Sequence, residues 1–451
     1  MSASTLRLLL GLSLVVTRSA VASWAYQESV APADLAVRFG QAVAADVRSD
    51  GSVRAVYVGA PNATVHDANG DHPAAGKVYV LTPTGGWHVA ATLTPVGTPY
   101  SVQDYAHFGT AVAVHAGVVV VGAPEYDFQG VHHDGGSVTV YEDTTRDDPG
   151  NPEPVLHPYA SGQLVLQGDD THLGASVAIN GASLDEGIWM ATGAPDDAGT
   201  GCVRVFRLVR PSAEYGGIAC GSAGSKLGSS LAIHALSQTG YVIVAGAPAV
   251  TQGDQALAGE AYVYVPIDDT ITKLDTLKAP NPVTLDAFGT AVALDATHIY
   301  VGGTGRWKSG VGRTGSVSIF EPTGIIGYSF DVEIFPGSGA SVGDLCGASL
   351  SARHEVDGFV AMGCPSHDGL VANEGVVRVL TLGSLLGNPF WFQDRLDMSD
   401  LPHGADDLGR SVALVGDHVY AGAPMHDDAF AADNGILRVF ATDRIFRDGF
   451  Q

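Results

Sequence analysis

One segment of the 451-residue chain combines cationic and aromatic side chains in a pattern suited to ligand binding. The sequence GRWKSGVGR, from Gly305 to Arg313, contains Arg306, Trp307 and Lys308 in a chain with only 23 lysines and arginines. Tryptophan and arginine dominate the energetics of many interfaces. We therefore expect this segment to contact an acidic or saccharide ligand. In the alternative interpretation it is a divergent turn, and Trp307 packs against a neighbouring repeat.

A second polar segment begins like a calcium-binding loop. Asp67, Asn69 and Asp71 alternate as oxygen-bearing residues, but His72 stands where such a loop requires glycine and no glutamate closes it. The same residue types also favour ordinary turns. The sequence therefore predicts no cofactor, with calcium at these three residues as the weaker alternative.

A third polar segment contains Asp127, His132 and His133. We expect these side chains to contribute to ligand contact. Histidines and carboxylates also bind zinc, but those of this chain lie in different repeats without fixed spacing, so the sequence predicts no zinc site. The alternative is that they are solvated loop residues.

Two strings match catalytic motifs by composition alone. Residues 339–343 read GASVG, like the G-x-S-x-G nucleophile elbow, and residues 310–315 read GVGRTG, like a dinucleotide-binding loop. Both motifs must lead into a helix. Each of these strings precedes an expected β-strand instead, so we predict no catalytic residue.

The elements that must position these segments follow a sevenfold repeat. Each copy has a Phe-Gly signal, a short apolar run, a longer apolar run that closes with Gly-Ala-Pro, and a strand that opens with glycine. The glycines of the first signal are Gly40, Gly109, Gly174, Gly228, Gly289, Gly347 and Gly409; those of the second are Gly59, Gly122, Gly193, Gly246, Gly302, Gly363 and Gly422; those of the third are Gly76, Gly136, Gly201, Gly259, Gly315, Gly375 and Gly435. A period near 60 residues with several short strands predicts an all-β, seven-bladed β-propeller.

Each copy supplies strands A, B and C, and a fourth strand D is clearest at 87–95, 328–336 and 391–398. Strand C alternates in polarity, which predicts a half-exposed strand. The last copy lacks strand D. Trp24, Val30 and Pro32 have the same relative spacing as Trp87, Leu93 and Pro95. We therefore predict that the N-terminal strand completes the four-stranded last blade and removes two exposed sheet edges.

The set of seven Phe-Gly and Gly-Ala-Pro signals resembles FG-GAP repeats, the blades of integrin α-chain propellers and of many bacterial secreted proteins. The resemblance implies that the face formed by the B–C and D–A loops binds a ligand. It also implies calcium loops between strands A and B. Here that loop is reduced to Asp46, Asp50 and Gly51, with Arg48 in a ligand position, so the family's calcium sites are not expected.

Four cysteines form two pairs, each 18 residues apart. Adjacent antiparallel strands would place Cys202 beside Cys220 and Cys346 beside Cys364, so we predict two disulfides within blades. Buried free thiols or a metal site are the alternatives, although no C-x-x-C spacing supports a metal.

Charge and targeting signals restrict the partner and the compartment. The formal net charge of −25 argues against nucleic acid and anionic lipid as partners. Residues 1–22 resemble a secretory signal peptide, with Arg7, an apolar core and an A-x-A site. We predict a propeller at 23–442, a short tail at 443–451 and no transmembrane segment. The expected product is a secreted, extracellular, periplasmic or cell-surface monomer.

These observations favour a non-enzymatic binding or adhesion module that uses the B–C and D–A loop face to recognise an extracellular protein or glycan. Two alternatives remain open. The chain is a hydrolase or lyase acting on an extracellular polymer, or it is a structural surface component, because a fold alone does not specify function.

Overall fold

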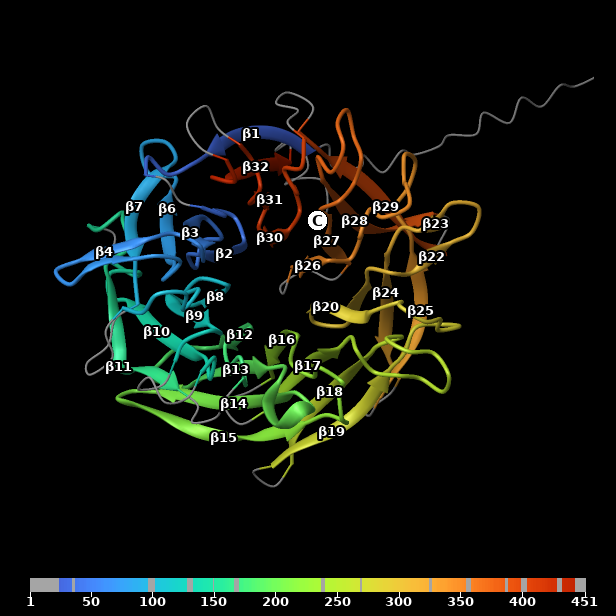
Figure 1. The fold of residues 1–451 in the computed structure, drawn as a ribbon, viewed down its shortest axis with the longest axis horizontal. Helices are drawn as coiled ribbons and strands as arrows, with labels where there is room; N and C mark the ends of the chain where they lie inside the picture. Colours follow the sequence, from blue (N-terminus) through green and yellow to red (C-terminus); the bar gives the residue numbers. More distant parts are fainter. Residues whose placement is uncertain are drawn as a thin grey trace, which may run out of the picture.

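The structure is a computed structural model that describes residues 24–34, 37–95, 102–127, 133–148, 150–165, 170–236, 240–267, 270–323, 327–353, 358–385, 388–398, 404–427 and 432–442. These residues form seven four-stranded antiparallel sheets arranged in a ring around a central opening (Figure 1). The chain is therefore a seven-bladed β-propeller, and the predicted fold class is confirmed. The predicted signal peptide and the tail at 443–451 lie outside the described residues.

Each blade runs from an innermost strand A to an outermost strand D. Blade 1 contains β2 (Ala42–Val47), β3 (Val53–Ala60), β6 (Lys77–Thr82) and β7 (His88–Leu93); blade 2 contains β8 (Ala111–His115), β9 (Val118–Ala123), β10 (Ser137–Asp143) and β11 (Leu156–Val165); blade 3 contains β12 (Ser176–Gly181), β13 (Ile188–Ala194), β14 (Cys202–Val209) and β15 (Ser212–Cys220); blade 4 contains β16 (Ser230–Ala235), β17 (Tyr241–Ala247), β18 (Glu260–Ile267) and β19 (Thr270–Leu277). Blade 5 contains β20 (Phe288–Leu294), β21 (Ile299–Gly303), β24 (Ser316–Pro322) and β25 (Tyr328–Ile334); blade 6 contains β26 (Ser349–Ala352), β27 (Phe359–Cys364), β28 (Val376–Leu385) and β29 (Asn388–Leu396); blade 7 contains β30 (Ser411–Val415), β31 (His418–Ala423), β32 (Ile436–Thr442) and β1 (Trp24–Val30).

Three of the B–C connections contain short elements of their own. Blade 1 carries the hairpin β4 (Val65–Asp67) and β5 (Gly70–His72), and blade 5 carries the hairpin β22 (Trp307–Lys308) and β23 (Gly312–Arg313). Blade 3 carries a single 3-10 turn, η1 (Asp197–Gly199). These elements distinguish three B–C loops from simple turns.

The N-terminal strand closes the ring. β1 pairs with β32 in antiparallel register, from Trp24 opposite Thr442 to Val30 opposite Leu437. The predicted completion of the last blade is confirmed. The two ends of the propeller domain therefore share one sheet, and separating the blades requires breaking that strand pair.

Strand C is more buried than its sequence pattern predicts. β10 (SVTVYED) is buried at every position except Glu142, and the hydroxyl residues Ser137 and Thr139 are buried with their apolar neighbours. The prediction of a half-exposed strand is wrong, because the adjacent blades cover both faces of the sheet. The alternation therefore reflects residue size within an interblade core.

Both predicted disulfides are present. Cys202 pairs with Cys220 between β14 and β15, and Cys346 pairs with Cys364 in blade 6. Two disulfides are consistent with an oxidising, extracellular or periplasmic compartment. Among the described residues, no helix has the length and hydropathy needed to cross a membrane.

The blades meet through glycines. A Cβ atom at Gly122 would overlap the carbonyl oxygen of Gly174 in the next blade and lie 3.0 Å from its Cα atom. The other six second-signal glycines show the same relation to the next Phe-Gly glycine, including Gly422 against Gly40 across the closure. The repeated glycines are therefore required because neighbouring backbones touch at these points.

Gly122→Ala tests this contact. The added methyl group meets backbone atoms that cannot rotate away, so we expect the free energy of unfolding to fall by about 3 kcal/mol. Gly404→Ala is the matched control, because the only atom near its added Cβ would be the Ala372 carbonyl oxygen, at 3.8 Å. Thermal unfolding followed by circular dichroism measures both variants. Equal melting temperatures for the two variants would contradict the proposed close contact.

Candidate functional site

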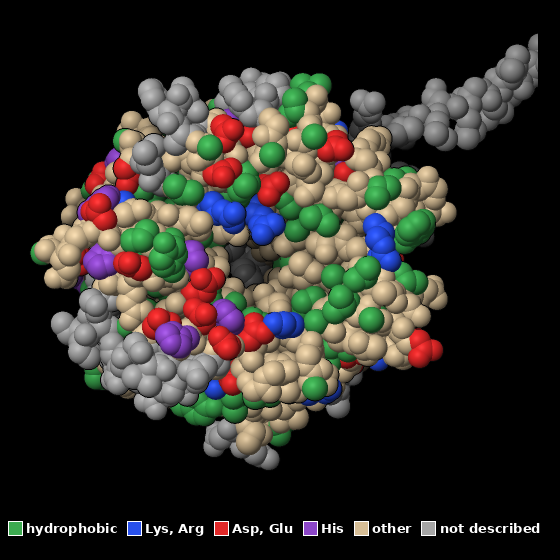
Figure 2. Space-filling model, in the orientation of Figure 1, with side chains coloured by type: hydrophobic (Ala, Val, Ile, Leu, Met, Phe, Trp, Pro, Cys, Tyr) green, Lys and Arg blue, Asp and Glu red, His purple; other side chains and the backbone are tan. Residues whose placement is uncertain are grey.

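Most of the long connections of the propeller lie on one face, although the C–D connection of blade 2, which spans 144–155, lies on the other. The B–C connection of blade 1 spans 61–76 and the D–A connection from blade 5 to blade 6 spans 335–348, whereas the A–B connection of blade 2 spans only 116–117. In antiparallel blades the B–C and D–A loops share a face, which we call the loop face. Figure 2 shows this face, with the central opening in view. Side chains available for recognition are therefore most numerous here.

The innermost strands enclose a central channel of about 240 Å³. Its lining consists almost wholly of small apolar residues such as Val43, Ala113, Ala178, Ala232 and Ala293. The channel wall offers no ionisable side chain among the described residues that line it. Any acid–base chemistry near the axis must therefore come from residues at the mouth of the channel.

Seven residues at this mouth occupy equivalent places, each immediately before the Phe position of a Phe-Gly signal. All seven have a left-handed backbone with φ between 50° and 64°; they are Arg38, His107, His172, Lys226, Ala287, Leu345 and Asp407. The amide of His172 donates to the Asp134 carbonyl of the preceding blade at 3.0 Å, and the amide of Arg38 donates to the Asp433 carbonyl at 2.8 Å. These backbone bonds hold the ring of seven residues in place.

Blades 2 and 3 each place a histidine–carboxylate pair in this ring. His107 Nδ1 lies 2.6 Å from Glu125 Oε2, and His172 Nδ1 lies 3.2 Å from Asp196 Oδ2. Lys226 of blade 4 also pairs with Asp196. Figure 2 shows acidic and histidine side chains together at the rim of the opening, over β8, β9 and β12. The hydrogen bond between His107 Nδ1 and Glu125 fixes the orientation of that imidazole and leaves its Nε2 for a ligand or a proton transfer, whereas His172 Nδ1 contacts Asp196 without forming a hydrogen bond.

Asp134 lies within the electrostatic reach of both pairs. Burial raises the pKa of Asp134, the charge of Glu125 raises it further, and His172 lowers it. Asp134 therefore retains its proton to a higher pH than an ordinary aspartate. The described residues contain no group of three side chains able to hold a metal ion. The arrangement is suited to hydrogen bonding or proton transfer with an organic ligand.

Arg306, a predicted ligand-contact residue, is buried. Its guanidinium group contacts Asp286 Oδ2 at 2.6 Å and Glu333 Oε1 at 2.6 Å, and it also donates to the Pro280 carbonyl. These partners outweigh the cost of burial and raise the pKa of Arg306. Arg306 therefore connects the B–C loop of blade 5 to the preceding D–A loop.

The other two cations of the segment also bond internally. Lys308 Nζ donates to the carbonyls of Pro336 and Gly337, and Arg313 donates to the carbonyls of Thr284 and Gly305 at 2.6 Å each. Trp307, in contrast, is 60% exposed. The segment therefore presents an aromatic side chain to solvent and directs its charges inward.

Exposed apolar side chains surround Trp307 on blades 4 to 6. We call Leu257, Leu285, Trp307, Val311, Val342 and Leu345 the Trp307 patch. Backbone hydrogen bonds connect their loops, from Ala287 to Leu257, from Leu285 to Ala256 and from Gly343 to Arg313. Figure 2 shows hydrophobic side chains over β20 and β24, toward the opening, and a further group at the β22–β23 hairpin on the outer edge of the ring, with Lys or Arg side chains beside it. The loop face is thus polar on blades 2 and 3 and apolar on blades 4 to 6.

The remaining sequence-predicted residues lie within local loop contacts. Asp127 Oδ1 accepts from the amide of Asp134 at 2.9 Å, and His133 Nδ1 lies 3.6 Å from Asp127 Oδ2. His132 lies outside the described residues. Asp127 and His133 therefore lie beside the channel mouth and near Asp134.

The three calcium candidates do not converge. Asp67 Oδ1 accepts from the amide of Asn69 at 2.6 Å and contacts His72 Nε2 at 3.2 Å, whereas Asp71 pairs with His66 across the β4–β5 hairpin. Local hydrogen bonds therefore occupy Asp67 and Asp71, and the structure does not bring the three predicted ligands into one shell.

Buried acid–base pairs repeat at one position in blades 5, 6 and 7. The pairs are Asp286 with Arg306, Asp344 with His367 and Asp406 with His426, at 2.6 to 3.1 Å. In each pair the aspartate lies three residues before the Phe-Gly glycine, and its partner lies four residues after the second-signal glycine. Each pair therefore joins the D–A loop that enters a blade to the B–C loop of that blade.

Sequence reasoning missed the ring at the channel mouth and these buried pairs. An alignment of the seven copies does contain the signal, because His107 and His172 occupy the same repeat position and Asp344 and Asp406 share another. Alignment identifies equivalent positions, but it does not show which of them face the channel and which are buried.

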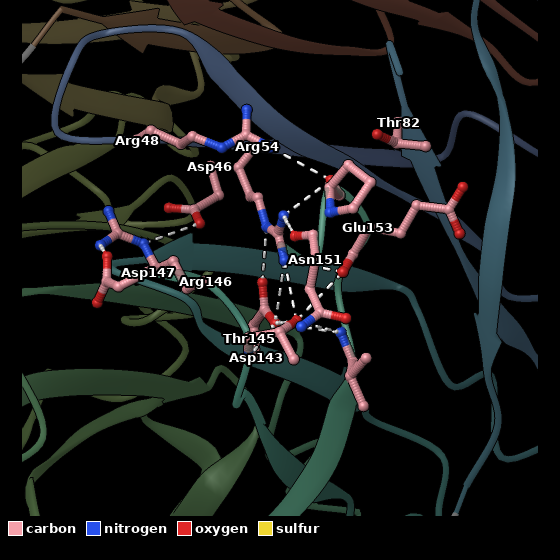
Figure 3. Close-up of polar contacts among 12 residues, drawn as sticks. Asp46, Arg48, Arg54, Thr82, Asp143, Thr145, Arg146, Asp147, Asn151 and Glu153 are labelled. Atoms are coloured by element: carbon pink, nitrogen blue, oxygen red, sulfur yellow. Dashed lines mark hydrogen bonds and ion pairs between the residues drawn. The ribbon is translucent and has the colours of Figure 1, made fainter. Parts of the chain in front are cut away.

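On the opposite face, charged residues join blades 1 and 2 (Figure 3). The Arg54 side chain is 1% exposed, contacts Asp143 Oδ2 at 2.9 Å and donates to the Asn151 carbonyl at 2.8 Å. Asp46, the best remnant of the calcium loop, contacts Arg146 Nε of blade 2 at 3.3 Å. Burial raises the pKa of Asp46, although Arg146 opposes this effect. These residues form an interblade clamp whose charges already have protein partners.

Comparisons with known proteins extend no further than the fold. The chain matches no profile of a known protein family and no curated protein. Among solved structures it is similar to the periplasmic gluconolactonase PpgL of Pseudomonas aeruginosa, with 14% identity and a TM-score of 0.47 over 79% of this chain and 85% of that chain. At this identity the likeness concerns the fold alone. Membership of the FG-GAP family stays a prediction.

Asp344→Asn tests the buried pair of blade 6. Burial would raise the pKa of Asp344, but hydrogen bonds from His367 and Ser341 outweigh burial and lower it. A lowered carboxyl pKa stabilises the fold above the ordinary pKa of aspartate, and this contribution is lost as the pH falls through the folded pKa. We expect the variant to lose about 3 kcal/mol of unfolding free energy at pH 7, and less at acidic pH.

Urea unfolding between pH 3 and pH 7 measures this dependence. Asp254→Asn is the control, because Asp254 is exposed and its change should stay within about 0.5 kcal/mol. A deficit of Asp344→Asn that stayed constant across this pH range would argue against a charged Asp344 as the source of the stabilisation.

Proposed function

We propose that the protein is an extracellular or periplasmic binding module that recognises its partner through the loop face. The observation that carries this proposal is the contrast between the two faces. The loop face bears most of the long connections, two additional hairpins and the exposed Trp307 patch. The charges drawn on the opposite face in Figure 3 bond to one another and join two blades.

The rigidity of the loop face supports this assignment. Buried pairs such as Asp344 with His367 fix the loops of blades 5 to 7, and Arg313 holds the loops on both sides of the β22–β23 hairpin. A preorganised surface loses little conformational entropy on binding, so more of its contact energy appears as affinity. These features suit recognition by a fixed surface.

Blocking one face at a time tests the proposal. The described cysteines are all in disulfides, so a single new cysteine can carry a bulky maleimide polymer. Asn69→Cys and Ser309→Cys both place the polymer on the loop face. We expect the labelled variants to bind their partners on arrays of secreted proteins and glycans about tenfold more weakly, or worse, than the unlabelled protein. Polymer at Glu186→Cys, in the A–B connection of blade 3, is the control and should have little effect. Equal retention by all labelled proteins would refute the use of the loop face.

A second candidate function is a hydrolase or lyase that acts on an extracellular polymer. The pairs of His107 with Glu125 and His172 with Asp196, together with Asp134, favour it, because they place two imidazoles, one of them oriented by a hydrogen bond, near a protonatable carboxyl group. One imidazole would accept a proton from water or substrate, and Asp134 would donate one to the leaving group. The apolar channel contributes no further acid or base from the described residues that line it.

Turnover of extracellular polysaccharides and esters separates this candidate from a binding module. If the chain is an enzyme, His107→Gln and His172→Gln should each lower kcat by about 100-fold, as expected for a lost general acid or base. His88, which lies on β7 of blade 1 and is 44% exposed, supplies the control variant His88→Gln, which should retain activity. Absence of turnover by the unmodified protein across the panel would leave the binding module as the supported function.

A further inference from the structure

We infer that the Trp307 patch binds a polypeptide segment with an apolar core flanked by lysine or arginine. This inference rests on the proposed function and specifies the chemistry of the partner. The patch consists of aliphatic side chains around one indole ring, and Val342 is 66% exposed. Burial of such side chains against another apolar surface stabilises a complex in proportion to the area removed from water.

The loops beneath the patch are fixed before a partner binds. Arg313 donates to the carbonyls of Thr284, Leu285 and Gly305, and its own carbonyl accepts from the amide of Gly343. Val342 lies over Gly312, where a Cβ atom would come 2.8 Å from Val342 Cγ2. The hairpin and the two adjoining D–A loops thus form one connected platform. A partner can bury Leu285, Trp307 and Val342 without first ordering these loops.

The charges around the platform favour a basic partner. Arg306, Lys308 and Arg313 are all bonded to carboxylates or carbonyls of the chain itself. Two exposed carboxylates lie in loops of the same blades, Asp254 in the B–C loop of blade 4, which also carries Leu257, and Asp368 in the B–C loop of blade 6. Lys278, which is 53% exposed in the loop that carries Leu285, pairs with Glu260. The net charge of −25 adds a general attraction for cations. Basic residues on both sides of an apolar core would meet these two carboxylates.

The residue types favour a polypeptide over a saccharide. A saccharide site needs planar polar groups that bond to hydroxyls, whereas Leu257, Leu285 and Val342 offer only methyl groups. The nearby guanidinium groups of Arg306 and Arg313 are already engaged by protein oxygens. A partner that matches this surface must itself present apolar side chains.

A peptide titration tests the inference with defined probes. A fluorescent peptide with a short core of leucine and phenylalanine flanked by lysines is compared with one flanked by glutamates and with one whose core is serine. We expect the lysine-flanked apolar peptide to bind at least about tenfold more tightly than either comparison peptide. Trp307→Ala should weaken that binding by about tenfold or more.

Two further variants complete the experiment. Tyr215→Ala removes an aromatic side chain of similar exposure, 61%, from β15 on the rim, and should bind the peptide normally. Asp254→Asn combined with Asp368→Asn should reduce the preference for lysine over glutamate flanks and the salt dependence of binding. These variants separate a contact at the patch from nonspecific attraction to an acidic protein.

The inference is overturned if Trp307→Ala and Tyr215→Ala bind the peptide equally, if the two kinds of flank bind equally, or if a neutral oligosaccharide competes for the same site. The proposed function still stands after any of these results, provided that maleimide polymer attached to the loop face continues to block binding of the natural partner. If that polymer has no effect while the peptide still requires Trp307, the proposed function fails separately.

Discussion

The close approach of glycine backbones between neighbouring blades determines the rest of the structure. A second-signal glycine such as Gly122 touches the Phe-Gly glycine of the next blade, and the same contact between Gly422 and Gly40 closes the ring. A third-signal glycine such as Gly76 lies against the backbone of Phe108 in the next blade. Since a side chain at any of these positions would separate the blades, the most regular motifs of the chain serve packing and leave recognition to other residues.

Residue types can differ between the blades only where this packing does not restrict the side chain, which is in the loops beside the repeated glycines. The position before each Phe-Gly signal shows the result, because blades 2 to 4 carry His107, His172 and Lys226 there, whereas blades 5 and 6 carry Ala287 and Leu345. One structural position, repeated around the axis, therefore divides the loop face into a polar half and an apolar half. The distribution of residue types over equivalent positions, more than any single motif, defines this surface.

The sequence was sufficient to predict the ring, its closure by residues 24–30 and both disulfides, because each depends on a repeated or paired feature that is visible along the chain. It was not sufficient to assign Arg306. The carboxylates that bury this guanidinium, Asp286 and Glu333, come from blade 5 but lie 20 and 27 residues away in sequence. Side-chain partners of this kind depend on loop geometry, which local patterns do not specify. The burial of strand C was mispredicted for a related reason, since neighbouring blades supply the cover.

The cationic loop at 305–313 need not bind an anion, because oxygen atoms of the chain itself already accept hydrogen bonds from its cations. Loops that leave a sheet have carbonyl groups without ladder partners, and a buried carbonyl requires a donor. A guanidinium group offers several donors in one plane, so Arg54 satisfies the carbonyls of Asn151 and Glu153 in one loop, and Arg313 satisfies carbonyls of two segments. These cations are bonded within the fold, although the Arg313 side chain remains 34% exposed, and the loops of the neighbouring blades keep exposed carboxylates such as Asp254 and Asp368. The internal use of Arg306, Lys308 and Arg313 is thus the physical reason why this region is apolar at its centre and acidic at its margins.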